Sequence, residues 1–117
     1  MTSDRMRRVD EAMREVLSGA ITSEIKDPRV GFVTVTGVKV TPDLRRAWVF
    51  YTSFGDDKAR AGTRAALRSA RPHLRSTIGR QVRLKYLPDL EFEEDQSLEN
   101  GQRIDELIRK LHEEGSG

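Results

Sequence analysis

The chain has 117 residues, no cysteine, 21 lysine and arginine residues against 19 aspartate and glutamate residues, and a net charge of +2. This length suits one domain with a modest hydrophobic core, and the lack of cysteine excludes disulfides and thiolate metal sites. No apolar run approaches the roughly 20 residues that a membrane span needs, and the amino terminus lacks an apolar signal-peptide core, so we expect a cytoplasmic protein with no membrane partner.

The first predicted element is a helix over residues 5–26, because apolar side chains recur there at the spacing of an amphipathic helix. Asp27 and Pro28 should stop it, since the residue before a proline avoids the helical region. Its start is basic, and its apolar residues are Met6, Val9, Met13, Val16, Leu17, Ala20, Ile21 and Ile25.

Two strands over residues 30–40 and 46–52 are predicted to form a hairpin around a turn at Pro42. Gly37 predicts a bulge or a close backbone approach in the first strand, and simple alternation places Val38 and Val40 on the face opposite Val35. The aromatic residues of the second strand, Trp48 and Phe50, are of a type that stacks on bases when exposed. Packing under the helices is the favoured alternative, because so small a domain has few large residues for its core.

A helix over residues 58–79 is predicted to break in its middle, with Asp56 or Asp57 capping its start and Gly79 ending it. Pro72 lacks a backbone N–H and drives the preceding residue from the helical region, so two short helices should meet at Arg71. The second would begin with Pro72 and leave the N–H groups of His73 and Leu74 free for an anion. In the alternative, the proline only sets the angle between the helices.

A third strand is predicted over residues 81–87, where Val82, Leu84 and Tyr86 alternate with Arg83 and Lys85, so that one face belongs to the core and the other is basic. A last helix over residues 102–111 and a disordered tail from residue 113 follow. The resulting order, α-β-β-α-α-β-α, indicates an α+β fold with one three-stranded sheet covered by helices on one face. We expect one domain over residues 1–117, with a core at about 5–93 and a carboxyl-terminal extension at about 94–117.

The charges of the second half are segregated. Residues 58–88 include nine basic side chains and no acidic one, whereas residues 89–99 include six acidic side chains and no basic one. Four arginines of the basic block are spaced by four, three and four residues, which puts them on one helical stripe. Arginine binds phosphate in a forked geometry, so the block predicts an RNA-binding surface whose affinity falls with salt. Its candidate residues are Arg64, Arg68, Arg71, Arg75, Arg80, Arg83 and Lys85.

Other readings of this block remain open. The basic face can be a solvated surface balanced in space by the acidic segment, or that segment and the last helix can dock a protein, which makes the chain an adaptor. A metal-dependent hydrolase using residues 89–95 is a third hypothesis. His73 has no evident carboxylate or serine partner, and no phosphate-binding loop or dinucleotide fingerprint is present. We therefore expect no enzyme, no catalytic residue, no metal and no cofactor.

Several ordered stretches resemble one known family. Asp27-Pro28-Arg29-Val30, Val33-Thr34-Val35-Thr36, Val38-Lys39-Val40-Thr41-Pro42-Asp43-Leu44 and Asp95-Gln96-Ser97-Leu98-Glu99-Asn100-Gly101-Gln102-Arg103-Ile104 are similar to ribosome-binding factor A. The resemblance runs from about Arg5 to Leu111. It implies a type II KH-like fold, α-β-β-α-(kink)-α-β, and a non-catalytic factor that binds the bacterial 30S subunit during late maturation of its 16S rRNA. It also implies a link to growth in the cold and release by a GTPase; off the ribosome we expect a monomer.

The resemblance also assigns a role to the helix break. KH domains hold nucleic acid with a Gly-x-x-Gly loop, which is absent here, and the family has Ala-x-Gly at an interhelical kink instead. This chain has Ala70, Arg71 and Pro72 at that place, so the family glycine is a proline. Because Pro72 contributes no N–H, we expect Arg71 and the arginine stripe, more than the backbone, to hold phosphate.

Overall fold

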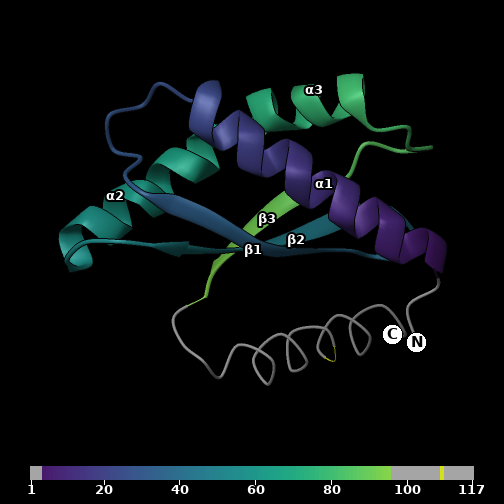
Figure 1. Ribbon diagram of the computed structural model, residues 1–117, viewed down its shortest axis with the longest axis horizontal. Helices are drawn as coiled ribbons and strands as arrows, with labels where there is room; N and C mark the ends of the chain where they lie inside the picture. Colours follow the sequence, from purple (N-terminus) through teal and green to yellow (C-terminus); the bar gives the residue numbers. More distant parts are fainter. Residues whose placement is uncertain (1–3, 96–108, 110–117) are drawn as a thin grey trace.

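The computed structural model of the protein describes residues 4–95 and Arg109. The elements are α1 (Asp4–Ser23), β1 (Val33–Val40), β2 (Arg46–Ser53), α2 (Asp57–Ser69), α3 (Arg71–Gln81) and β3 (Asp89–Glu94). Figure 1 shows the three helices on one side of the sheet. The predicted α+β class and the order of these six elements are confirmed. The predicted helix over residues 102–111 and the tail lie outside the described residues, and no described helix is long and apolar enough to cross a membrane.

The sheet has the order β1-β2-β3, with β1 antiparallel to β2 and β2 parallel to β3. The predicted bulge is confirmed, because the register between β1 and β2 shifts between Val35 and Gly37. One extra residue exchanges the two faces of a strand. Val35 before the bulge and Val38 and Val40 after it therefore all join the core. The simple alternation predicted from the sequence, which separated Val35 from the other two, is wrong for this reason.

Trp48 and Phe50 of β2 were predicted to pack under the helices, but they do not lie under α1, α2 or α3, the helices that the structure describes. Ala47, Val49 and Tyr51 belong to the core on the helix side, and alternation along a strand therefore places Trp48 and Phe50 on the opposite face. Phe50 is only 2% exposed and Trp48 is half-buried, so neither ring stands free for base stacking.

The third strand was predicted over residues 81–87 and lies instead at Asp89–Glu94. Helix α3 continues through Gln81, and the following residues form the connection that brings the chain back beside β2. Pro88 ends this connection, and β3 then pairs Leu90 with Ala47 and Phe92 with Val49 on the helix side. The alternation of Val82, Leu84 and Tyr86 looked like a strand, but a parallel strand can start only after the chain has returned along the sheet.

The core lies between the helices and the sheet. Met13 and Leu17 of α1, Leu67 of α2 and Leu74 of α3 are completely buried there. Asp10 of α1 is a buried carboxylate, and its Oδ1 accepts a hydrogen bond of 2.9 Å from the N–H of Val40 in the hairpin. Burial raises the pKa of Asp10, while the Val40 bond and nearby Lys39 oppose that rise. Together these contacts fix α1 along β1.

The segment between α1 and β1 is held by Asp27 and Arg29. The Asp27 carboxylate accepts hydrogen bonds from the Arg29 backbone N–H at 3.0 Å and from its guanidinium at 2.6 Å. The Arg29 carbonyl in turn accepts a bond of 3.2 Å from the hydroxyl of Thr63 in α2. The Asp-Pro-Arg sequence therefore forms a local clasp that also contacts α2.

This clasp predicts an unusually acidic carboxyl group. Hydrogen bonds from Arg29 lower the pKa of Asp27 to about 2. Because this pKa is lower than in the unfolded chain, the clasp stabilises the fold above about pH 4 and loses that contribution as the pH falls toward 2. A carbon-detected NMR titration should show the Asp27 carboxyl still ionised at about pH 3. In the variant Arg29→Gln, the Asp27 carboxyl should titrate at a higher pH. Equal titration midpoints for Asp27 in the two proteins would show that Arg29 does not cause its low pKa.

Candidate nucleic-acid interface

The kink between α2 and α3 consists of one residue. Ala70 ends α2 and begins α3, with φ −83° and ψ −3°, so its backbone stays in the right-handed helical region. The helices meet at Ala70 and not at Arg71 as predicted, and Pro72 is the second residue of α3, where a proline is tolerated. Asp56 caps α2 as predicted through a bond of 2.8 Å from the N–H of Ala59.

Two further predictions about this kink are wrong. The N–H of Leu74 is not free, because it donates to the carbonyl of Ala70 at 3.0 Å. Gly79 does not end the second helix, which continues to Gln81. The first error comes from treating Pro72 as a full break, and the second comes from taking Gly79 as a C-cap. A proline in the first turn removes only its own donor, and the helical hydrogen bonds resume directly after it.

Arg71 completes the kink from its side chain. In an uninterrupted helix the N–H of residue 72 would donate to the carbonyl of residue 68, and Pro72 has no such donor. The Nε of Arg71 donates to the Arg68 carbonyl at 3.2 Å and so takes the place of the missing N–H of residue 72. An Arg71 Nη1 also lies 3.8 Å from a carboxylate oxygen of Glu91. Arg71 is therefore part of the kink and only partly free to hold phosphate.

The acidic strand β3 neutralises part of the basic block. The Glu94 side chain is 6% exposed. Its Oε1 lies 2.8 Å from Nη2 of Arg60 and 3.8 Å from Nη2 of Arg64. The carboxylate also accepts a hydrogen bond of 2.6 Å from the hydroxyl of Ser53. Glu94 pairs with Tyr51 in the sheet register, on the side where α2 lies. The alternative in which the acidic segment balances the basic face is thus realised for this part of the stripe.

Arg75 has a clear structural contact. Its Nε donates to the Pro88 carbonyl at 3.0 Å and its Nη2 to the Leu87 carbonyl at 2.8 Å, while Asp89 lies 3.5 Å away. The guanidinium therefore holds the connection between α3 and β3 against α3. We therefore assign Arg75 a structural role, which is to position this connection.

Three of the seven candidate residues are exposed and have no carboxylate within ion-pair distance among the residues that the structure describes: Arg68, Arg83 and Lys85. Arg83 and Lys85 line an open cleft of about 620 Å³ formed by residues 79–85 at the end of α3. Arg68 lies at the end of α2 beside the kink. These three cations are the ones whose charge is directed outward.

The structure adds two residues that the sequence did not reveal. Tyr86, predicted to be in the core, is 46% exposed, and the guanidinium of Arg45 lies 5.4 Å from its ring centre. Lys85 Nζ lies 5.7 Å from the same ring. Base recognition commonly combines an aromatic ring with flanking cations. Sequence reasoning missed Tyr86 as a base-contacting residue, because the alternation of residues 82–86 predicted a strand with Tyr86 on its buried face. That strand does not form.

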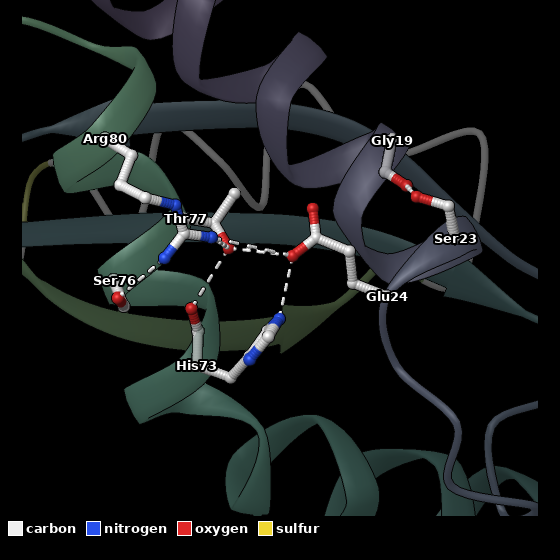
Figure 2. A network of polar contacts seen from close by, with 7 residues as sticks. All are labelled: Gly19, Ser23, Glu24, His73, Ser76, Thr77 and Arg80. Atoms are coloured by element: carbon white, nitrogen blue, oxygen red, sulfur yellow. Dashed lines mark hydrogen bonds and ion pairs between the residues drawn. The ribbon is translucent and has the colours of Figure 1, made fainter.

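Arg80 belongs to a polar network that joins α3 to the end of α1 (Figure 2). His73 Nε2 lies 2.7 Å from Oε1 of Glu24, and the hydroxyl of Thr77 donates to the same oxygen at 2.9 Å. Arg80 Nη2 lies 4.0 Å from that oxygen and donates to the Thr77 hydroxyl at 3.1 Å. The bonds from His73 and Thr77 lower the pKa of Glu24. His73 thus has a carboxylate partner that sequence spacing did not indicate.

The described residues include no group of three histidine, cysteine, aspartate or glutamate side chains placed to hold a metal ion. The arrangement offers instead a helical surface of arginine and lysine donors around a kink. Such a surface can bind phosphate, and the exposed Tyr86 can contact a base. These are capacities for binding.

Comparison with known proteins identifies the family. The family model for ribosome-binding factor A matches residues 5–108. Ribosome-binding factor A of Geobacter sulfurreducens is 50% identical over 111 residues, which cover 95% of this chain and 94% of that protein. The protein of the same name from Halothermothrix orenii is 44% identical over 114 residues, covering 97% of this chain and 93% of that protein.

Solved structures agree with this match. The crystal structure of ribosome-binding factor A from Thermus thermophilus superposes with a TM-score of 0.68 at 27% identity, covering 76% of this chain and 94% of that one. A homology model of the Thermus thermophilus factor fitted into the cryo-EM map of a 30S–RbfA complex superposes with a TM-score of 0.59 at 29% identity, covering 70% of this chain and 86% of that one. The chain belongs to the ribosome-binding factor A family.

Proposed function

We propose that this protein binds the free 30S ribosomal subunit and its 16S rRNA during late rRNA processing and assists maturation without catalysing a reaction. The observation that carries the proposal is the family match over residues 5–108, together with the related Thermus factor fitted into a 30S complex. The outward-directed cations around the kink support it, because phosphate binding needs such donors. In this proposal residues 1–117 act as one KH-like domain.

The contacts of the basic block divide its seven candidate residues into three groups for this function. Arg68, Arg83 and Lys85 make the first phosphate contacts, because within the described residues no carboxylate neutralises them. The other candidates, Arg64, Arg71 and Arg80, lie within 4.0 Å of one carboxylate each and remain at least 39% exposed. They contribute when a phosphate oxygen replaces that carboxylate. Arg75 contributes by holding the connection on which Arg83 and Lys85 lie.

The same contacts weaken the adaptor hypothesis. A protein-docking acidic face needs free carboxylates, yet Asp89, Glu91 and Glu94 each lie within 4.0 Å of an arginine of α2 or α3. Carboxylates that neutralise their own chain offer little to a basic partner. RNA binding is therefore the function that the geometry supports best. The further expectations of the family (a monomer off the ribosome, a cytoplasmic location and release by a ribosome-associated GTPase) complete the proposal.

Sedimentation with purified ribosomal subunits tests the proposal. We expect the protein to pellet with 30S and not with 50S subunits, and its affinity to fall steeply as salt rises from about 0.05 to 0.2 M, because phosphate contacts release counterions. Nuclease digestion of the rRNA should release it. A complex that survives complete digestion would favour the adaptor, and failure to pellet with 30S subunits at low salt would contradict the proposed function.

A further inference from the structure

Three polar side chains of α3 converge on one carboxylate oxygen from another part of the chain. His73, Thr77 and Arg80 are spaced by four and three residues and so share one face of the helix. All three face Oε1 of Glu24, at 2.7, 2.9 and 4.0 Å respectively (Figure 2). Helix α3 thus presents a set of donors suited to an anion, and the chain fills it with its own carboxylate.

The carboxylate in this site is held loosely. The side chain of Glu24 is 31% exposed, that of His73 is 50% exposed and that of Arg80 is 59% exposed. Exposed ion pairs contribute little net stability, because water solvates both partners well when they separate. Glu24 directly follows the last residue of α1, so a rotation of its side chain can leave the donors without moving a helix. The site can therefore exchange one anion for another.

The position of the site indicates which anion would compete. His73 and Thr77 lie in the first two turns of α3, directly after the kink at Ala70, and Arg68 lies on the other side of that kink. Arg80 of this site also lines the cleft that contains Arg83 and Lys85, so Glu24 places negative charge beside exposed cations. A phosphate oxygen accepts the same charge-assisted hydrogen bonds as a carboxylate oxygen. An RNA bound to Arg83 and Lys85 would bring a neighbouring phosphate close to the Glu24 site.

We propose that His73, Thr77 and Arg80 form a binding site for a backbone phosphate of RNA, which Glu24 occupies in the free protein and leaves on binding. This rests on the proposed function and adds a phosphate site and its internal competitor to it. A ligand that contacts Arg83 and Lys85 at the same time displaces Glu24 more readily than a single small anion does.

Affinity for 30S subunits across a salt series tests the displacement. Glu24→Gln removes the charge and keeps the shape, and Glu24→Ala removes the competitor entirely. Both should bind about fivefold more tightly than the wild type, because a charged hydrogen-bonding site becomes available. The slope of log K against log salt should stay close to that of the wild type, because the phosphate contact forms in both complexes. The matched control is Glu15→Gln, an exposed glutamate of α1, which should change the affinity little.

A second comparison shows whether the gain passes through the proposed donors. In a His73→Gln, Thr77→Val background, Glu24→Gln should no longer raise the affinity. The proposal is overturned if the Glu24 variants bind no better than the wild type, if Glu15→Gln produces the same gain, or if the gain persists without His73 and Thr77. A role for Glu24 in merely joining α1 to α3 predicts weaker or unchanged binding, the opposite sign.

Inorganic phosphate tests the site without the ribosome. In Glu24→Gln, added phosphate should shift the His73 imidazole resonances, whereas the wild type should respond only at higher phosphate concentrations. Absence of a shift in Glu24→Gln would overturn the anion site. If 30S subunits bind neither the wild type nor Glu24→Gln but phosphate still shifts the His73 resonances, the proposed function is wrong. The site then binds a free anion and not an RNA phosphate. If the subunits bind all variants equally, only this inference fails.

Discussion

The double variant Arg68→Glu, Arg83→Glu should bind 30S subunits at least about 100-fold more weakly than the wild type at low salt. A hydrogen bond to a charged group contributes roughly 1.5–3 kcal/mol, so loss of two arginine–phosphate contacts removes about 3 kcal/mol or more. The slope of log K against log salt should also fall by about 1.4–1.8, because two phosphate contacts are lost. These two arginines are chosen because, among the described residues, no carboxylate lies within ion-pair distance of either. Their reversal should therefore leave the fold intact.

The control makes the same change in net charge elsewhere. Arg7 and Arg14 of α1 each contact a carboxylate one turn away, Asp4 and Glu11 respectively. Arg7→Glu, Arg14→Glu should therefore weaken binding far less than the double variant of the interface. Sedimentation or fluorescence titration of the three proteins measures the difference. Equal losses would show that overall charge, and not this surface, governs binding.

Truncation of Leu74 to alanine should lower the free energy of unfolding by about 3 kcal/mol. Leu74 lies one turn after the kink, is completely buried and belongs to the main core. Replacing a buried leucine with alanine loses transfer free energy and leaves a cavity, at a cost of about 2–5 kcal/mol. Helix α3 carries the donors of the Glu24 site and leads to Arg83, so this packing also positions the interface. Urea denaturation followed by circular dichroism gives the value.

Leu87→Ala is the matched control, because it makes the same chemical change at a leucine that is 37% exposed. Its cost should stay below about 1 kcal/mol, since much less area is removed from the core. Under native conditions the folded Leu74→Ala protein should still bind 30S subunits. Similar destabilisation by the two variants would show that α3 is not anchored through Leu74.

Much of the fold was predictable because its signals are local. The apolar spacing of α1, the cap at Asp56, the bulge at Gly37 and the turn at Pro42 each depend on residues close in sequence. The family, too, was recognisable from ordered short motifs. The errors lie where local patterns compete: the helix breaks as predicted but at Ala70 and not at Arg71, and residues 81–87 alternate like a strand but serve as a connection.

The candidate site was predictable in residue type and not in detail. The sequence by itself determined that a helix pair with a central kink would carry arginines, because periodicity and proline chemistry act over a few residues. Only the tertiary structure decided which of those arginines are available. Strand β3 lies parallel to β2 and against α2 and α3, and so brings Glu91 to Arg71 and Glu94 to Arg60 across at least 20 residues of sequence. Likewise Glu24 meets His73 only because α1 packs against α3. Ion pairs depend on distance in space, and that distance is set by the packing of the sheet and helices.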